Sequence, residues 1–336
     1  MDRLQQLFNN IKTLIYEAIN ENRGRPKKKT RGRPFTDEIA IHTALIVLLA
    51  TLNGWTIHQT HRNLTCKNST WRQLLGIRLS DIPTRRTLNN RCNHPLVERW
   101  QQRITKRMFK RLLNQRNLYV VSIDMSDLPA QLYDTLANWG VCGKGEFYGY
   151  KLHLVVTRDG IPLGLVITRA NSRETSITDH LLARVAQALT DENIDSLVFL
   201  IGDKAYDSNP ASNQARQFLS VQMIAPVNTR KSSEFKGELS RRTKKKLRER
   251  GTNRDKAILL YESKKGKSMY RKCRVVIEQV IDQLKNDLGL SQLPYWVRGV
   301  RKVIKRVRNV VFAYVCILYC NKLHRRPLRG VAPYLI

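Results

Sequence analysis

Three acidic residues stand at positions where their carboxylates can meet on one side of a β-sheet. Asp124 follows an apolar run that begins at Leu118, and Asp203 follows a second apolar run that begins at Ser196. We predict that both runs are buried strands that end at their acids, because near-continuous apolar runs of this length fit strands covered on both faces. Glu278 lies on a predicted helix beyond the last strand, and we predict that this helix folds back to supply a third carboxylate.

The chemistry open to such a cluster depends on cations. The chain of 336 residues carries 60 Lys and Arg against 27 Asp and Glu, a formal charge of +33, yet carboxylates in contact still repel one another unless cations lie between them. Oxygen-only ligands select Mg²⁺ or Mn²⁺. Two such ions roughly 3.5–4 Å apart activate a water or a 3′-hydroxyl and stabilise the leaving oxygen in phosphoryl transfer. Nucleases, polymerases and recombinases share this chemistry.

The composition also indicates a partner and a setting. The excess of positive charge predicts a polyanionic partner, and nucleic acid fits best. The six cysteines form no CxxC pair, so we expect a reducing, intracellular setting and no structural zinc. The first residues resemble an amphipathic helix rather than a signal peptide, and the most apolar run, 310–320, is too short to span a membrane. We therefore expect a cytoplasmic protein with no membrane partner.

The first 34 residues combine a helix with a cationic arm. Residues 1–22 place apolar side chains on one helical face. Residues 23–34 contain Arg-Gly-Arg-Pro twice, and because Pro and Gly prevent a helix, the arm is extended and narrow enough for a DNA minor groove. Each copy resembles the core of an AT-hook; the alternative is a solvated basic linker, and both contact DNA phosphates. The arginines concerned are Arg23, Arg25, Arg31 and Arg33.

Residues 35–116 have a helical pattern throughout. Thr36 is a predicted N-cap for the first helix of this region. Thr84 is a predicted N-cap for a short polar helix over 85–91, which is similar to the recognition helix of a helix-turn-helix. Arg85 and Arg86 would then contact DNA. The alternative is an ordinary small helical bundle with a solvated basic face.

Residues 117–336 predict an α/β domain built on a mixed sheet. Two strands, 148–157 and 161–168, are joined by a tight hairpin signal, and we expect them beside the first strand. A helix, a strand, a helix, a strand and a helix follow, and a helical crossover requires parallel pairing. A Lys- and Arg-dense segment, 227–267, interrupts this order, either as a basic insertion that lies on DNA or as a solvated charge run. The last helix, 300–323, is expected to pack against the sheet.

Several segments together resemble an insertion-sequence DDE transposase. The resemblance covers roughly 118–323, and 35–115 more loosely, and it implies a ribonuclease-H-like core with flanking helices. In that core Asp124 and Asp203 would bridge two Mg²⁺ or Mn²⁺ ions, and Glu278 would complete the second metal site. The segments that carry it are Ile123–Ser126, Tyr148–His153, Gly202–Asp207 and the helix with Arg274, Glu278 and Lys285.

The same resemblance implies a function and a division into domains. The function is binding to terminal inverted repeats in double-stranded DNA, hydrolysis at each end and transfer of the freed 3′-hydroxyl to target DNA, by a homodimer in a prokaryotic cytoplasm, associated with the nucleoid. Two alternatives are open: a DNA-binding regulatory protein that has lost cleavage, and a metal-dependent nuclease without strand transfer. The predicted domains are 1–34, an all-α DNA-binding region 35–116 and a catalytic domain 117–336. Residues that the resemblance places on the DNA phosphates are Lys151, Arg274 and Lys285.

The predicted catalytic helix departs from the family pattern at one position. Tyr270 lies one residue too far from Arg274, which leaves the role of this tyrosine open. Arg274 and Lys285 also have a simpler alternative to DNA binding, since both are spaced to form ion pairs with Glu278 or Asp282 on the same helix. Asp282, one turn beyond Glu278, is either a competing acid of the site or a solvated helix charge.

Other polar residues near the predicted acids have expected roles outside the metal site. Asp127 is expected to cap a turn after the first strand. Asp207 is expected to N-cap the helix that begins near Ser208. His153 is expected to be a packed, hydrogen-bonded strand residue rather than a ligand.

Overall fold

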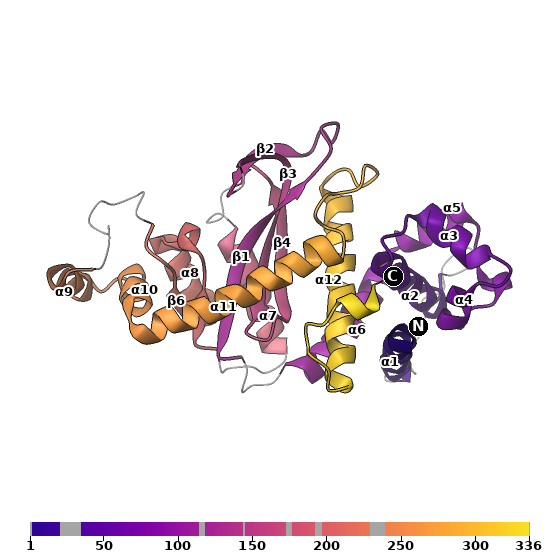
Figure 1. The fold of residues 1–336 in the computed structure, drawn as a ribbon, viewed down its shortest axis with the longest axis horizontal. Helices are drawn as coiled ribbons and strands as arrows, with labels where there is room; N and C mark the ends of the chain where they lie inside the picture. The colour runs from indigo at the N-terminus through magenta and orange to yellow at the C-terminus, as the bar shows by residue number, and fades with distance from the viewer. Residues whose placement is uncertain are drawn as a thin grey trace. The chain divides into compact units, whose positions relative to one another are not determined.

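The computed structural model describes residues 2–20, 35–113, 118–143, 145–172, 177–191, 197–228 and 239–335. The chain forms two compact units whose segments alternate along the sequence (Figure 1). One, called here the helical unit, comprises 1–112, 287–289 and 307–336; the other, the sheet unit, comprises 113–286 and 290–306.

The helical unit forms where helical periodicity and capping residues predict helices. The apolar face of its first helix is buried, as predicted. The Thr36 hydroxyl accepts a hydrogen bond from the backbone N–H of Ile39, and Thr84 likewise accepts from Thr87, so both predicted N-caps are confirmed. The helices are α1 (Asp2–Asn20), α2 (Asp37–Leu52), α3 (Ile57–Thr65), α4 (Thr70–Leu75), α5 (Arg85–Cys92) and α6 (Pro95–Leu112).

The C-terminal helix α12 (Val300–Leu323) begins in the sheet unit and continues in the helical unit. Its apolar second half is buried, and its polar side chains bond to α6: the Nη1 atom of Arg111 donates to the Tyr319 hydroxyl, and Lys322 Nζ donates to the carbonyl of Leu112 at 2.9 Å. These contacts group residues 307–323 with the helices. The predicted division, by contrast, keeps all of 117–336 in one domain and packs this helix on the sheet.

The described residues contain no single helix that is long and apolar enough to cross a membrane. The bent pair α2 and α3 is long and apolar enough only when the two helices are taken together, by length and composition alone. Most residues of α2 are buried in the protein.

The sheet unit is built on a six-stranded mixed sheet, which confirms the α/β prediction. The strand order is β2-β3-β1-β5-β6, and β4 pairs with β3. β1 is antiparallel to β3 and parallel to β5, and β5 is parallel to β6. β4 therefore neighbours β3 rather than β1, and β2 has no counterpart among the predicted strands. The bounds are β1 (Val120–Pro129), β2 (Asn138–Cys142), β3 (Gly145–Thr157), β4 (Pro162–Arg169), β5 (Phe199–Ile201) and β6 (Gln222–Ile224).

The first strand does not end at Asp124. β1 continues to Pro129 because β3 pairs with it along this whole length, from Val121 opposite Thr157 to Pro129 opposite Gly149. The polar residues after Asp124 favour a turn when they are read alone, but the hydrogen-bonding edge of the long strand β3 outweighs that local preference. The predicted strand end was wrong, and Asp124 lies within the strand.

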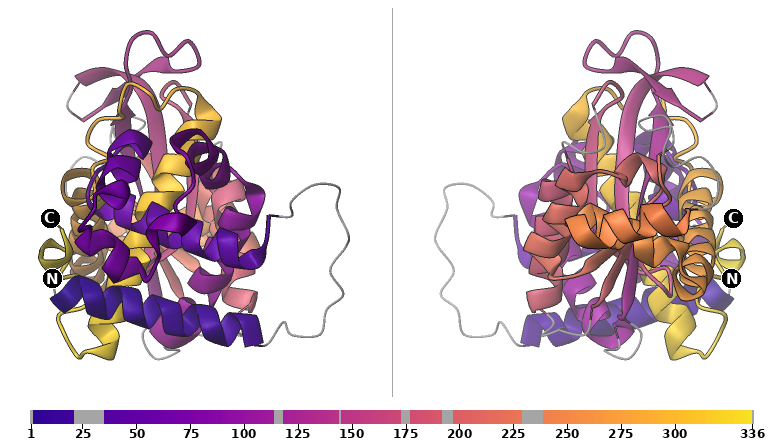
Figure 2. Two further views of the ribbon diagram at one scale, coloured as in Figure 1. Left: turned by 90° about the vertical axis from the view of Figure 1, so that its right-hand side faces the viewer. Right: turned by 90° about the vertical axis from the view of Figure 1, so that its left-hand side faces the viewer.

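Helices cover both faces of this sheet. Val121 and Ile123 pack into a core with α7 (Thr178–Asp191) and α8 (Asn209–Leu219) on one face. On the other face Val120 packs with Cys273 of α11 (Lys264–Asp282), which crosses in front of the strands in Figure 1 and is visible from other sides in Figure 2. Neighbouring residues of β1 thus serve opposite faces, as strand geometry requires.

The basic segment 227–267 is largely helical where it is described. It contains α9 (Arg241–Arg250) and α10 (Asn253–Glu262), and residues 229–238 lie outside the described part. Leu247 of α9 and Ile258 of α10 are buried together, and Ala257 reaches the main core of the sheet unit. The segment is therefore attached to the fold through α10, while the cationic side chains of α9 are mostly exposed.

Candidate active site

The position of Asp124 on β1 decides which face its carboxylate serves. Val120, Ser122 and Asp124 alternate with Val121 and Ile123, so they point to the face that α11 covers. The Ser122 hydroxyl donates to the carbonyl of Cys273 at 3.4 Å, which brings α11 directly over this part of the strand. Asp124 is 8% exposed, and its Oδ1 accepts a hydrogen bond from the N–H of Met125 at 2.9 Å.

Asp203 lies at the equivalent position beside β1. The parallel pairing of β1 and β5 sets Ser122 opposite Ile201, and each acid follows its paired residue by two positions. Because neighbouring strands lie about 4.8 Å apart, this register directs the two acids to one end of the strand pair. Asp203 is half-buried, and its carboxylate caps the short 3₁₀ helix Lys204–Tyr206 by accepting from the N–H of Ala205 at 2.9 Å.

Glu278 joins the site through Arg274, one turn earlier on α11. The guanidinium of Arg274 lies 2.9 Å from Asp124 Oδ2 and 3.0 Å from Glu278 Oε1. The Arg274 side chain is 15% exposed, whereas that of Glu278 is 57% exposed. The site thus runs from a buried acid on the strand, through an enclosed arginine, to an acid that faces solvent.

The charge of Arg274 interacts with those of all three acids. Burial raises the pKa of Asp124 from 3.8 to about 6; the Arg274 charge opposes this shift, and the Asp203 charge adds to it. Burial lowers the pKa of Arg274, but the charges of Asp124, Glu278 and Asp203 outweigh it and shift this pKa upward. Arg274 is therefore a permanent cation among three carboxylates.

The three acids fit a divalent cation by ligand type, since carboxylate oxygens are what Mg²⁺ and Mn²⁺ prefer. Within the part of the chain that the structure describes, no three His, Cys, Asp or Glu side chains are close enough together to hold one ion. Arg274 lies between Asp124 and Glu278 and supplies the positive charge there. The side-chain types match the predicted ions. In this conformation Asp124 and Glu278 are ion-paired with Arg274.

A second ion pair lies farther along β1. Lys285, in the π-helical turn Gln283–Asp287 that continues α11, donates from Nζ to the carbonyl of Asp127 at 3.1 Å and to its Oδ1 at 2.9 Å. Asp127 belongs to β1, so the prediction that it caps a turn was wrong; the cause is the extension of the strand along β3. Lys285 thus pairs across the fold and not along its own helix.

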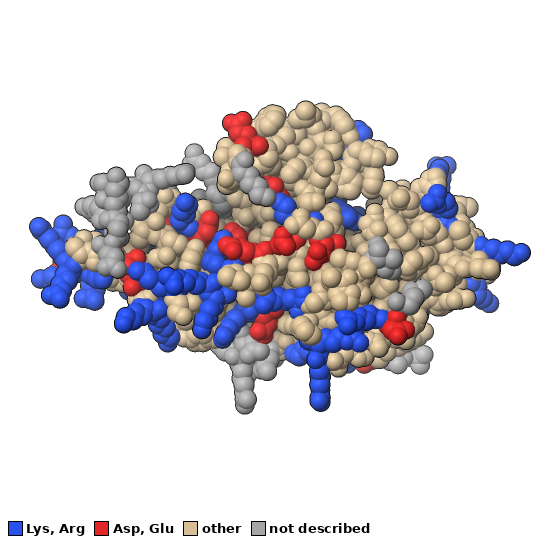
Figure 3. Space-filling model, viewed as in Figure 1, with Lys and Arg blue, Asp and Glu red and all other residues tan. Residues whose placement is uncertain are grey.

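The charges of this face are not evenly spread. In Figure 3 acidic side chains gather along the middle of the face, beside α11, and Lys and Arg side chains border them below. An acidic strip within a basic surface suits cations inside the strip and a polyanion around it. The pattern agrees with the residue geometry around Arg274.

Residues 115–316, more than half of the chain, match the transposase DDE domain family. This chain belongs to that family. No curated protein matches the chain. Among solved structures, one match is the cryo-EM structure of a piggyBac transposase synaptic complex with hairpin DNA, with 9% sequence identity, a TM-score of 0.46 and coverage of 98% of this chain and 77% of that chain.

The residues that sequence reasoning assigns to the DDE domain lie in different settings. Asp124, Asp203 and Glu278 are inside the matched range and gather around Arg274. Lys151 is 6% exposed and donates to the carbonyl of Ser172 at 3.1 Å, so its ammonium is held by the protein. The structure therefore pairs Arg274 with two of the predicted acids, Asp124 and Glu278, and brings Asp203 within range of its charge. It engages the predicted lysine in a contact of its own.

Other expectations near the DDE acids have clear outcomes. His153 is buried and hydrogen bonds with the Thr168 hydroxyl at 3.0 Å, as predicted for a packed histidine. Asp282 is exposed at the surface, which favours the solvated helix charge of the two alternatives. Tyr270 packs edge-on against Tyr261, with ring centroids 5.2 Å apart, and burial raises the pKa of its hydroxyl to about 12.

Sequence reasoning missed one buried ion pair beside the acids. Asp207 is 4% exposed and forms two 2.8 Å contacts with the guanidinium of Arg254 on α10, and it also accepts from the N–H of Asn228. The N-cap of α8 is Ser208, so the predicted cap at Asp207 was wrong. Asp207 instead fastens α10 to the chain just beyond Asp203. No sequence signal links the two partners, because they are 47 residues apart and meet only in the fold.

The predicted DNA contacts outside the DDE domain fall in two groups. Arg85 and Arg86 are exposed on α5, and the Arg85 guanidinium lies 3.5 Å from the His58 ring. The four arginines of the AT-hook-like arm, Arg23, Arg25, Arg31 and Arg33, lie outside the described residues.

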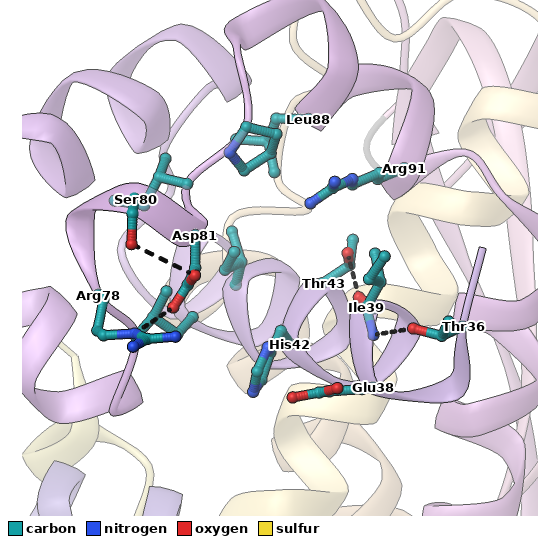
Figure 4. Close-up of a pocket in the computed structure, with 14 residues that line it drawn as sticks. Thr36, Glu38, Ile39, His42, Thr43, Arg78, Ser80, Asp81, Leu88 and Arg91 are labelled. Carbon is teal, nitrogen blue, oxygen red and sulfur yellow. Dashed lines mark hydrogen bonds and ion pairs between the residues drawn. The ribbon is translucent and has the colours of Figure 1, made fainter. Parts of the chain in front are cut away.

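A cavity of about 620 Å³ lies in the helical unit, and none of the residues that line it is a predicted catalytic residue. Figure 4 shows its polar side chains: Glu38 and His42 from α2, Arg91 from α5, and the ion pair of Arg78 with Asp81 at 3.1 Å. Acidic and basic side chains are balanced around it, so it does not share the acidic character of the DDE site.

Proposed function

We propose that this DDE transposase binds the terminal inverted repeats of its element as a homodimer and performs divalent-metal-dependent DNA cleavage and strand transfer. The sheet unit would be a ribonuclease-H-like catalytic core, and residues 35–116 would form a DNA-binding domain. The family membership supports the class of reaction. The finer statements rest on the geometry of the acids and on the distribution of charge.

One observation carries the proposal: Arg274 is ion-paired with both Asp124 and Glu278, and the Asp203 charge acts on Asp124 and Arg274 alike. Acids from β1, from the segment after its neighbour β5 and from α11 would therefore form one site around Arg274. Carboxylates that lie near one another repel, so such an arrangement costs folding free energy and is typical of functional sites. The family that contains this chain consists of DNA-processing enzymes.

Asp124, Asp203 and Glu278 would hold the two Mg²⁺ or Mn²⁺ ions. When bound, such ions activate the attacking hydroxyl and stabilise the leaving oxygen of an in-line displacement. The chain supplies the setting: β1 and β5 fix two carboxylates by backbone pairing, and the exposure of Glu278 leaves that side of the site open to DNA. Arg274 would turn from the acids to a DNA phosphate once cations neutralise them.

The DNA contacts would divide between the two units. Arg85 and Arg86 are exposed on a short capped helix, which suits a recognition helix in the major groove. Lys285 and Lys151 are held by Asp127 and by the Ser172 carbonyl, so a role for them on phosphates requires those contacts to open. The arm with Arg23, Arg25, Arg31 and Arg33 would follow the minor groove.

The test uses purified protein, Mg²⁺ and a linear DNA that carries both ends of the element. Asp203→Asn should reduce end cleavage by at least ~100-fold, because replacing even an outer partner of a metal ligand costs ~10–100-fold. DNA affinity should stay within about twofold, since the change removes no DNA-facing cation. Asp282→Asn, which changes an exposed acid one turn beyond Glu278, is the matched control and should cleave at the wild-type rate.

Each contrary result has a definite meaning. Wild-type cleavage by Asp203→Asn would show that the acids are wrongly assigned. Cleavage by the wild type with no joined product on target DNA would identify a nuclease without strand transfer. Tight binding to the ends with no cleavage by the wild type would identify a regulatory DNA-binding protein.

A further inference from the structure

The sheet unit exposes a group of large apolar and aromatic side chains near the far end of β1. Trp139 is 60% exposed and Tyr295 is 61% exposed, and exposed apolar side chains that are grouped on a surface mark interaction sites. Figure 3 shows a mostly uncharged surface over the β2–β3 end of the molecule. The group, called here the aromatic patch, comprises Leu132, Tyr133, Trp139, Val141, Tyr295 and Trp296.

Asp134 ties together the segments that carry the patch. Asp134 is 3% exposed and accepts hydrogen bonds from the Tyr150 hydroxyl at 2.9 Å and from the N–H of Gly299 at 2.9 Å, while its carbonyl accepts from the Tyr148 hydroxyl at 2.8 Å. These bonds join the 130–137 loop, β3 and the segment before α12. The exposed rings therefore stand on a fixed support.

Contacts between the rings continue this support to the surface. The Trp139 ring lies 5.5 Å from the Tyr148 ring, and Tyr295 meets Trp296 edge-on at 4.9 Å. The guanidinium of Arg298 lies over the Tyr133 ring at 4.2 Å from its centroid. Preordered aromatic faces of this kind bind flat ligands with little loss of side-chain entropy.

The charge beside the patch indicates the ligand. Arg298, Arg301 and Lys302 are exposed where the patch meets the start of α12, and cations next to aromatic faces are the arrangement that binds single-stranded nucleic acid. The cations neutralise phosphates while the rings stack on bases. A second copy seated on this patch would instead set these three cations against their own counterparts.

We propose that the aromatic patch stacks on unpaired bases of the DNA strand that leads to the cleavage site. The inference rests on the proposed function and names a feature of its substrate. Pro129, whose carbonyl accepts from the N–H of Leu293 next to the patch, is five residues beyond Asp124 on β1. At about 3.3 Å per residue this is about 17 Å, or about five nucleotide steps of about 3.4 Å.

The experiment compares two DNA probes by fluorescence anisotropy: a labelled 20-nucleotide oligo-dT and a labelled 20-base-pair duplex. The double variant Trp139→Ala/Trp296→Ala should bind the oligonucleotide ~10- to 100-fold more weakly, because each stacked base contributes about a factor of ten. Its affinity for the duplex should change by less than about threefold. Tyr16→Ala, at an exposed tyrosine on α1, is the matched control and should bind both probes like the wild type.

The wild type also gives a direct signal, because bases that stack on tryptophan quench its fluorescence. The double variant should lose most of the quenching by oligo-dT. Equal losses of affinity for both probes, or no loss for either, would overturn the stacking role. A sedimentation change in the variant without any effect on oligo-dT would instead assign the patch to a second copy. If the wild type bound neither probe, the proposed DNA function would fail as well, so the two failures are distinguishable.

Discussion

At the scale of single residues, the fold shifts the pKa of Asp124 far above its ordinary value. It is 8% exposed, and burial with the neighbouring Asp203 charge raises its pKa to about 6 in spite of Arg274. The native state therefore binds more protons at this residue than the unfolded state does between about pH 4 and pH 6. By linkage, its contribution to the free energy of unfolding is full below pH 4 and is lost as the pH rises through about 6.

This sign gives a prediction for Asp124→Asn. The variant cannot titrate at this position, so the free energy of unfolding of the wild type minus that of the variant should fall as the pH rises from 4 to 7. The fall should be roughly 3 kcal/mol, from a shift of about two pKa units. Urea denaturation in a chelator at four pH values measures it. A difference that stays constant with pH would contradict the raised pKa of Asp124.

Residue types were predictable from the sequence, but their partners were not. The three acids were singled out because each ends or follows an apolar run or lies on a helix with basic neighbours. The ion pairs of Asp127 with Lys285 and of Asp207 with Arg254 join residues 158 and 47 positions apart, and only the folded chain brings them together. Local pattern carries no information about such pairs, and for both of these aspartates it indicated a cap.

At the scale of elements, periodicity and caps predicted most of the helices, but not α9 and α10 of the basic segment, and predicted the strands less well. Thr36 and Thr84 cap the helices they were expected to cap, since an N-cap depends on the next three residues alone. The length of β1, the existence of β2 and the π-helical turn at Lys285 depend on partners elsewhere in the fold. Cross-strand pairing decides strand ends, and a sequence window does not contain it.

The junction of α10 and α11 determines where α11 carries Arg274 and Glu278. Ser263 ends α10 and caps α11, accepting from the N–H of Gly266 at 2.9 Å. A Cβ at Gly266 would lie 1.8 Å from the carbonyl oxygen of Leu260. The two helices approach so closely that only glycine fits at this position.

Gly266→Ala should therefore destabilise the protein by about 1–3 kcal/mol or more, since overpacking forces the backbone to shift. End cleavage should fall with it, because α11 carries two residues of the site. Gly143→Ala is the matched control: its Cβ meets no atom within 4 Å, and its stability should stay within about 0.5 kcal/mol of the wild type. Thermal and urea unfolding of both variants measure the contrast, and equal stability of the two would show that α11 shifts without cost.

At the scale of the whole molecule, the formal charge of +33 is the dominant property. The acids that carry the proposed chemistry are few and concentrated, whereas the cations are spread over both units. DNA affinity should then come mainly from counterion release and depend steeply on salt. The helix α9 should contribute strongly to this affinity, because its cations are mostly exposed and only Leu247 is buried.

Three cations of α9 share one helical face, Arg241, Lys245 and Arg248, since they are spaced by four and three residues. Lys245 also lies 3.8 Å from Glu249, an exposed pair that holds it weakly. Replacing all three with Gln should lower the slope of log affinity against log salt concentration by about 0.9 for each phosphate that the helix no longer neutralises, up to about 2.7 in all. Arg241→Lys/Lys245→Arg/Arg248→Lys keeps every charge and should retain the wild-type slope. Titrations of one duplex from about 50 to about 300 mM salt give both slopes; if the Gln variant keeps the wild-type slope, α9 does not lie on DNA, and its charge serves solvation alone.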